Sequence, residues 1–104
     1  MTNYIYFSTV SSEEEAKKIA TYLVENKVVA CVNIINNIAS IYTWEGKMEQ
    51  SKEHLLIIKT SEEKSDELIH TIESLHSYDT PECIGIKIEK GSQKYLKWIK
   101  DVVN

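Results

Sequence analysis

The sequence predicts an α+β fold in which one antiparallel sheet carries two helices on one face. Strand-like hydrophobic patterns occur in four segments, and amphipathic helical spacing occurs in three others. Their order along the 104 residues is β-α-β-β-α-β-α. This is the split β-α-β pattern of ferredoxin-like domains, followed by an additional C-terminal helix. We expect residues 1–104 to form a single domain, because chains of this length rarely divide.

The first two elements are a strand and a helix. Residues 4–10 alternate weakly between apolar and polar side chains, which predicts a strand. A helix is predicted to follow as far as about Asn26, since apolar residues recur there at helical spacing. Two overlapping capping boxes mark its start, Ser11 with Glu14 and Ser12 with Glu15.

The central segment predicts an unusually long β-hairpin. Residues 28–44, VVACVNIINNIASIYTW, and residues 47–60, KMEQSKEHLLIIKT, flank a turn at Glu45 and Gly46. At about 3.3 Å per residue, the first arm would extend roughly 56 Å if straight. A domain of this size has a radius of gyration near 13 Å, so the arm must bend, break or overhang. Because an overhanging apolar edge needs a partner, the hairpin predicts oligomerisation.

Four consecutive apolar residues in the second arm add to this expectation. Residues 55–58, LLII, cannot alternate between core and water. Both main helices should lie on the same side of the sheet, because right-handed crossovers place them there. We therefore expect a neighbouring subunit to cover the other side.

The second half of the chain predicts a helix, a strand and a last helix. Thr60 and Glu63 offer a capping box for the first of these helices, whose apolar positions are Leu68, Ile69, Ile72 and Leu75. Residues 77–81 end that helix, and residues 83–89, CIGIKIE, alternate as a strand. Gly91 and Ser92 then begin the last helix.

Composition argues against nucleic-acid and membrane partners. The net charge is −4, and all 12 basic residues are lysines, so the arginine fork that suits phosphate and guanine is absent. Apolar runs are too short for a membrane span, and the N-terminal residues lack a basic leader, so we expect a cytoplasmic protein. Cys31 and Cys83 lie in apolar strand-like segments and are expected to be buried, reduced thiols.

Catalytic signatures are not found in the sequence. A nucleophile elbow, an HExxH helix, a CxxC pair and a phosphate loop are all missing, so we expect no enzyme activity. The side chains left with chemistry are Cys31, Tyr42, Trp44, Lys59, His76, Tyr78, Glu82 and Trp98.

Each candidate also has a structural interpretation. His76 suits the last turn of its helix, where a donor or cation meets free carbonyl groups. His54 and His70 stand among charged neighbours, which favours solvent exposure. Lys59 suits a salt bridge to another subunit as well as it suits a catalytic amine. Aromatic side chains favour an interface or core over a binding cage at three positions, Tyr42, Trp44 and Trp98.

Five separated blocks of the chain resemble the CutA family, known as divalent-cation tolerance proteins. The blocks are ACVNI at 30–34, SIYTWEGK at 40–47, EHLLIIKT at 53–60, HSYDTPE at 76–82 and GSQKYLKWI at 91–99. The resemblance implies a ferredoxin-like fold and a homotrimer joined through its sheets. It also implies an architecture similar to that of the PII signal-transduction proteins.

The resemblance further implies a link to copper. Copper ligands assigned in some members of the family correspond here to Ser8, Leu75 and His76, so only His76 remains as a ligand. Two other positions also differ from the family pattern. Asn36 and Ser77 stand where the family has prolines, and a flexible Ser77 is expected to loosen the loop that leads to Pro81.

The function expected from the sequence is therefore a non-enzymatic, trimeric, cytoplasmic protein of divalent-metal tolerance. It would bind copper or another divalent cation weakly, with His76 and Cys31 as candidate ligands and no organic cofactor. One alternative is a PII-like sensor that binds a small molecule in clefts between subunits, lined by Lys59, Tyr78, Glu82, Trp44 and Trp98. Another is a scaffold for an unidentified protein partner.

Overall fold

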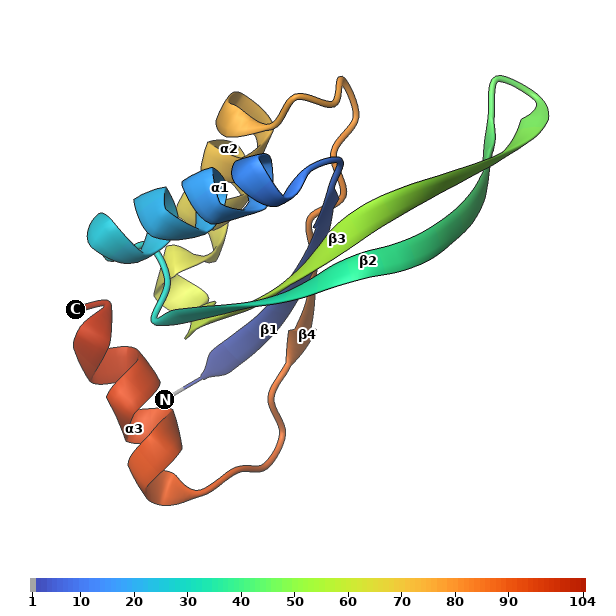
Figure 1. Ribbon diagram of the computed structural model, residues 1–104. Helices are drawn as coiled ribbons and strands as arrows, with labels where there is room; N and C mark the ends of the chain where they lie inside the picture. The colour runs from blue at the N-terminus through green and yellow to red at the C-terminus, as the bar shows by residue number, and fades with distance from the viewer. Residues whose placement is uncertain (1) are drawn as a thin grey trace.

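The computed structural model describes residues 2–104 and confirms the α+β class (Figure 1). Within these residues, four strands form one antiparallel sheet and three α-helices accompany it. In chain order, the elements are β1 (Asn3–Val10), α1 (Glu13–Glu25), β2 (Cys31–Trp44), β3 (Lys47–Ser61), α2 (Ser65–Leu75), β4 (Ile84–Lys87) and α3 (Gln93–Val102).

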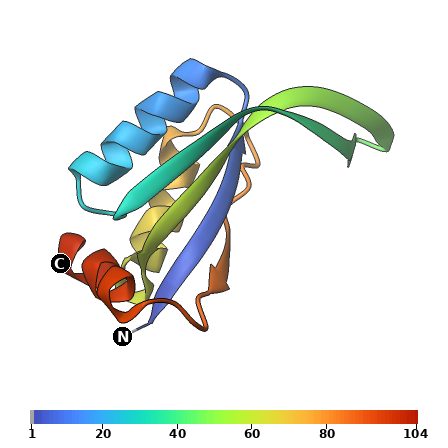
Figure 2. The same ribbon diagram turned by 60° about the horizontal axis from the view of Figure 1, so that its bottom comes forward.

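The strands lie in the order β2-β3-β1-β4, which a split β-α-β chain produces. Helices α1 and α2 pack on one face of this sheet (Figures 1 and 2), where apolar residues of both helices meet strand residues. The fully buried members of this core include Ile19, Leu23, Leu56, Ile58, Leu68 and Ile72. Each such side chain stabilises the fold by about 1.5–3 kcal/mol relative to its exposed state.

Helix α3 packs against the opposite face, near the beginning of β1. Ile99 of α3 and Val103, which directly follows the helix, form a small second core with Ala30, which directly precedes β2. The side-chain amide of Asn3 donates to the carbonyl oxygen of Leu96 at 3.0 Å and ties the helix to β1. The rest of this face has no helix over it (Figure 2).

The hairpin both bends and overhangs, as the sequence predicted. At the bend, Asn36 and Asn37 interrupt the register between Ile35 and Ile38 as a β-bulge. Asn37 has a φ of 61°, a left-handed conformation that asparagine tolerates well. Beyond this point the two strands leave the rest of the sheet (Figure 1), and the molecule measures 44 × 26 × 22 Å.

The predicted start of the first arm was wrong by three residues. Residues 28–30 are apolar because they pack into the core, and pairing along the strand begins only at Cys31. Lys27, with a φ of 56°, turns the chain out of α1, and the amide of Val28 closes the helix end on the carbonyl oxygen of Leu23. At the other end, the turn at Glu45 and Gly46 is confirmed by positive φ at both residues, as a type I′ turn requires.

The capping predictions had mixed outcomes. Ser12 caps α1 by accepting a hydrogen bond from the amide of Glu15 at 3.1 Å, as expected. Thr60 does not cap a helix, because β3 continues to Ser61 opposite Asn3. The Thr60 hydroxyl instead donates to the carbonyl oxygen of Val28 at 2.7 Å, and α2 starts only at Ser65, after a 3₁₀ turn.

The uncovered side of the sheet, here called the open face, is apolar. Leu56 and Ile58 point into the core, whereas Leu55 and Ile57 are half-buried on the open face. Register places six apolar residues together there: Ile5, Phe7, Leu55, Ile57, Ile84 and Ile86. Ile84 and Ile86 are 59% and 61% exposed in the single chain. Burial of residues 55–58 on both sides is therefore incomplete within one chain.

The two cysteines are free and lie toward opposite edges of the sheet, as predicted, but both are only half-buried, whereas the sequence predicted burial. Cys31 begins β2, and Cys83 directly precedes β4. Three strand spacings separate these edges, or about 14 Å, which exceeds the reach of a disulfide.

Gly85 provides a test of packing at the β4 edge. A Cβ atom at this position would lie 2.5 Å from the ring of Tyr6, which is buried in the core and cannot move away. We expect Gly85→Ala to lower the free energy of unfolding by about 1–3 kcal/mol in urea titrations at matched protein concentration. Gly91→Ala is the control, because its Cβ would meet only the flexible Leu96 side chain at 3.1 Å. Equal unfolding midpoints for the two variants would contradict this account.

Candidate functional site

A cleft lies between the hairpin and the loop that follows α2. We call it the arm cleft, and its volume is about 670 Å³. It forms where β1 ends and β3 continues without it, so that the curled hairpin and the loop enclose space. The lining side chains that carry charge or an aromatic ring are Tyr42, Trp44, Glu53, Tyr78, Asp79 and Glu82.

A short hydrogen bond joins the two walls of the arm cleft. The phenol of Tyr78 donates to Oε2 of Glu53 at 2.6 Å. Glu53 is only 7% exposed, so its carboxylate depends on this donor in place of water. Burial, followed by the hydrogen bond to Glu53 and its charge, raises the pKa of the Tyr78 phenol. The phenol therefore remains a donor at physiological pH.

The arm cleft is strongly anionic. Glu53, Asp79 and Glu82 line it, and no lysine or histidine does so among the described residues. Burial and the negative charge of Glu53 raise the pKa of the Glu82 carboxyl. A cation in the cleft would lower the pKa of the Glu82 carboxyl again, whereas an anion would raise it further.

His76 positions the loop that carries Tyr78. Its Nδ1 accepts a hydrogen bond from the amide of Tyr78 at 3.0 Å, so Nε2 carries the proton and donates to the carbonyl oxygen of Thr9 at 2.8 Å. The ring also packs on that of Tyr78, with centroids 4.6 Å apart. Both ring nitrogens are thus engaged, and a metal at His76 would have to displace one of these bonds.

Ser77 fastens the same loop to α1. Its amide donates to Oε2 of Glu15 at 2.8 Å, and its hydroxyl donates to Oε1 at 3.0 Å. The expectation that Ser77 loosens the loop was therefore wrong, because serine brings two donors that proline lacks. Glu15 uses its carboxylate here and does not close the predicted capping box on Ser12.

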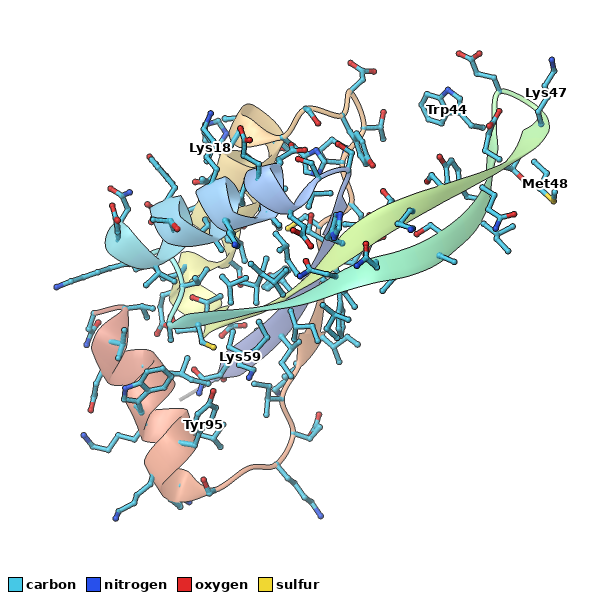
Figure 3. The ribbon with its side chains drawn as sticks, viewed as in Figure 1. Lys18, Trp44, Lys47, Met48, Lys59 and Tyr95 are labelled. Atoms are coloured by element: carbon cyan, nitrogen blue, oxygen red, sulfur yellow. The ribbon has the colours of Figure 1, made fainter. Side chains whose placement is uncertain are left out.

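Lys59 and Trp98 lie far from the arm cleft. Trp44 is near the tip of the hairpin, whereas Lys59 lies beside Tyr95, a residue of α3 (Figure 3). The Lys59 ammonium group donates to Oδ1 of Asn33 at 2.8 Å and stands 5.7 Å from the centroid of the Tyr95 ring. The ring of Trp98 packs on that of Tyr95, with centroids 5.4 Å apart. One chain thus brings together Trp44, Tyr78 and Glu82 of the predicted set.

The remaining metal candidates are dispersed. No group of three His, Cys, Asp or Glu side chains converges as a metal site within residues 2–104. The Cys31 thiol donates a hydrogen bond to Oδ1 of Asn33 at 3.7 Å. Burial, with smaller contributions from Glu73 and Glu82, raises the pKa of the Cys83 thiol to about 11, which keeps it protonated and unreactive.

The other two histidines, and the positions that correspond to copper ligands, differ in their burial. His70 is exposed as expected, but the expected exposure of His54 was wrong. His54 is buried, and its Nδ1 accepts a hydrogen bond from the amide of Asn37 at the bulge. Leu75 has no atom that could bind a metal, and Ser8 is fully buried on the helix-covered side, with no hydrogen-bond partner for its hydroxyl within residues 2–104. None of the helices in residues 2–104 combines the length and apolarity needed to cross a membrane.

Glu53 and Asp79 were missed as site residues by sequence reasoning. A signal for Glu53 existed, because alternation places it on the same side of β3 as Leu55 and Ile57, where a charged residue is unusual. Asp79 lies between two predicted cleft residues, Tyr78 and Glu82.

Comparison with known proteins identifies the family. The profile described as "CutA1 divalent ion tolerance protein" matches residues 4–102. The chain belongs to this family. Among solved structures, CutA of Xylella fastidiosa superposes with a TM-score of 0.96 at 33% identity, covering 98% of both chains. The periplasmic divalent cation tolerance protein CutA of Archaeoglobus fulgidus gives a TM-score of 0.93 at 44% identity, covering 100% of both chains.

Curated relatives include longer proteins. The chloroplastic CutA protein of Arabidopsis thaliana is 43% identical over 97 residues, covering 93% of this chain and 53% of its own length. The chain therefore spans about half the length of that relative. The divalent-cation tolerance protein of Archaeoglobus fulgidus is 45% identical over 103 residues, covering 99% of each chain.

The contact between Glu15 and Ser77 predicts an acid-sensitive contribution to stability. Burial opposes the shift, but the hydrogen bonds from Ser77, aided by His76 and Ser11, lower the pKa of Glu15 below 4.5. A carboxyl group whose pKa is lowered in the folded state stabilises the protein at pH values above its ordinary pKa. This stabilisation is lost as the pH falls through the lowered pKa.

We therefore expect Glu15→Gln to reduce the free energy of unfolding by about 1 kcal/mol at pH 7, with the difference from wild type closing under acid. Urea titrations between neutral and acidic pH would measure this. Glu14→Gln, in the same exposed first turn of α1, is the matched control. A constant difference across the pH series would contradict the role assigned to Glu15.

Proposed function

We propose that this protein is a non-enzymatic, cytoplasmic homotrimer that takes part in divalent-cation tolerance and binds copper weakly. Family membership supports the role in tolerance. The observation that carries the assembly is the apolar open face, which no part of the described chain covers. Free thiols at Cys31 and Cys83 suit a reducing compartment.

The trimer proposal rests on the open face and on the overhanging hairpin together. Exposed apolar residues continue from the face along the hairpin, where Ile41 is 66% and Met48 76% exposed. An area of this kind is unusual on a monomer, and closed rings of identical subunits bury such surfaces without leaving edges. The anionic arm cleft and the Lys59 ammonium group, at separate places on the chain, would also be complementary across a head-to-tail contact.

The copper proposal retains His76 as the main ligand. Copper(II) heads the affinity order for divalent metals and binds available imidazole groups. Oε2 of Glu15 lies 3.7 Å from Nδ1 of His76 and would be a second metal ligand at the same place. Binding should be weak, because the metal must replace the hydrogen bond from the Tyr78 amide and finds few other donors. Cys31 is the alternative ligand, on the other side of the sheet.

A PII-like sensor of small molecules is the second candidate function. It is favoured by one observation, that Trp44, Tyr78 and Glu82 line a cleft of about 670 Å³, a volume typical of ligand sites. Lys59 and Trp98 would join this cleft only from a neighbouring subunit. Catalysis is not favoured, because the raised pKa values of Tyr78 and Cys83 leave both groups protonated and poorly nucleophilic.

Light scattering after size exclusion would test the trimer. We expect a mass of about 36 kDa at micromolar concentration, three times the 12.0 kDa of one chain. Ile86→Glu should shift the mass toward the monomer, because it places a charge on the apolar open face, at its β4 edge. Val24→Glu changes an equally apolar residue that is 42% exposed on α1 and should leave the mass unchanged. A stable 12.0 kDa wild-type species would refute the proposal.

Titration calorimetry would test the copper site. We expect a dissociation constant in the micromolar range or weaker for the wild type, and loss of the signal in His76→Ala. His70→Ala is the matched control, since His70 is an exposed residue of α2. Circular dichroism should first establish that both variants fold. Submicromolar affinity that survives the loss of His76 would place the site elsewhere, with Cys31 as the next residue to replace.

A further inference from the structure

We propose that a second copy of the chain completes the arm cleft, with the ammonium group of the partner subunit's Lys59 pairing with Glu82 and Glu53. The inference rests on the trimer proposed above and adds to it which surfaces meet. It makes the cleft a site shared by two subunits, because Lys59 lies away from the cleft of its own chain.

The first step is the layout of the open face along β3. Alternation places four residues of the strand on this side, in the order Lys59, Ile57, Leu55 and Glu53. A cation thus lies at one end, apolar side chains lie in the middle, and a carboxylate lies at the other end. Six residues along an extended strand separate the two charges by about 20 Å. Lys59 is therefore out of reach of its own arm cleft.

The second step is the pairing state of these charges. The Lys59 ammonium group donates to Oδ1 of Asn33 at 2.8 Å and makes no ion pair within residues 2–104. Glu82 pairs with no basic side chain there, and burial, followed by the charge of Glu53, raises the pKa of its carboxyl. An unpaired cation on one patch and unpaired carboxylates in another are complementary when two copies meet head to tail.

The third step is the apolar surface between the charges. Ile84 and Ile86 of β4 are 59% and 61% exposed, and they share the open face with Leu55 and Ile57. Burial of such side chains drives association, whereas charges at the two ends select one arrangement over others. A copy shifted along the face would press Lys59 against apolar side chains and leave its charge unpaired. The charges therefore favour the arrangement in which Lys59 meets the cleft.

Aromatic rings would arrive at the cleft together with the cation. Lys59 stands 5.7 Å from the centroid of the Tyr95 ring, beside α3 (Figure 3), and the ring of Trp98 packs on that of Tyr95. The carboxylates of one subunit would then meet a lysine with two aromatic neighbours from the next. A small molecule held in this shared site would contact both subunits.

Charge reversal followed by rescue would test the pair. Lys59→Glu should lower the urea midpoint at which light scattering detects loss of the trimer by about 1 M or more, because it turns a carboxylate toward the cleft. Adding Glu82→Lys should restore at least half of this shift, since the two charges are then exchanged. Lys18→Glu, on an exposed residue of α1 (Figure 3), is the matched control and should leave the midpoint unchanged.

The rescue needs its own control. Glu14→Lys added to Lys59→Glu gives the same net charge as the exchanged pair, but Glu14 lies on α1 and its replacement should restore nothing. Equal recovery by Glu82→Lys and Glu14→Lys would overturn the proposal. Equal midpoints for Lys59→Glu and Lys18→Glu would do so as well.

Cross-linking gives a second measurement, which does not depend on stability. Within one chain, Glu82 lies two strand spacings from Lys59 and four residues before Ile86, the residue of β4 in line with it, or about 16 Å away. Lys59→Cys with Glu82→Cys, in a chain carrying Cys31→Ser and Cys83→Ser, should give covalent dimers and trimers with a short bis-maleimide. Either new cysteine alone should give monomers on a reducing gel. Monomers from the paired variant would contradict the contact.

The outcome can be separated from that of the proposed function. A trimeric wild type that shows neither rescue nor cross-links would refute this contact and leave the trimer proposal standing. A wild-type mass of one chain would refute both. Cross-links between Lys59→Cys and Glu82→Cys in a trimeric protein would support both.

Discussion

The structure depends on one mismatch of lengths in the sheet. Strand β3 has 15 residues, whereas its central neighbour β1 has 8, so nearly half of β3 pairs only with β2. The helix-covered core ends where β1 ends, and the hairpin continues beyond it. The arm cleft, the exposed aromatic residues and the overhanging edge all follow from this difference. The bulge at Asn36 and Asn37 then curves the unsupported part, which brings Trp44 to the same cleft as Glu53.

Local patterns in the sequence predicted the elements whose side chains point consistently to one side. Residues 4–10, the spacing of Ile19 and Leu23, and the turn at Glu45 and Gly46 are of this kind. The errors occur where long-range contacts decide the outcome. Thr60 has the chemistry of a cap, but pairing with β1 keeps it in a strand. His54 has charged neighbours in sequence, yet the bulge formed by the other arm provides its partner and buries it.

The candidate site was predictable only in part for the same reason. Tyr78, Glu82 and Trp44 were singled out from their chemistry, and one cleft contains all three. Lys59 and Trp98 were expected to join them in a cleft between subunits, and within one chain these two residues lie at α3. No pattern in the sequence states that the phenol of Tyr78 crosses from the loop to Glu53, which is 25 residues away along the chain. That contact exists because β1 stops short and leaves room for it.

The bond between Ser77 and Glu15 has a consequence for how the chain tolerates change. One of its two donors belongs to the backbone, so most residues placed at position 77 would keep the amide contact at 2.8 Å. Proline alone would delete it, and it would then leave a partly buried carboxylate at Glu15 without its main donor. The two positions are therefore tied as a pair, although 62 residues separate them. A glutamate at 15 is therefore best matched to a chain without proline at 77.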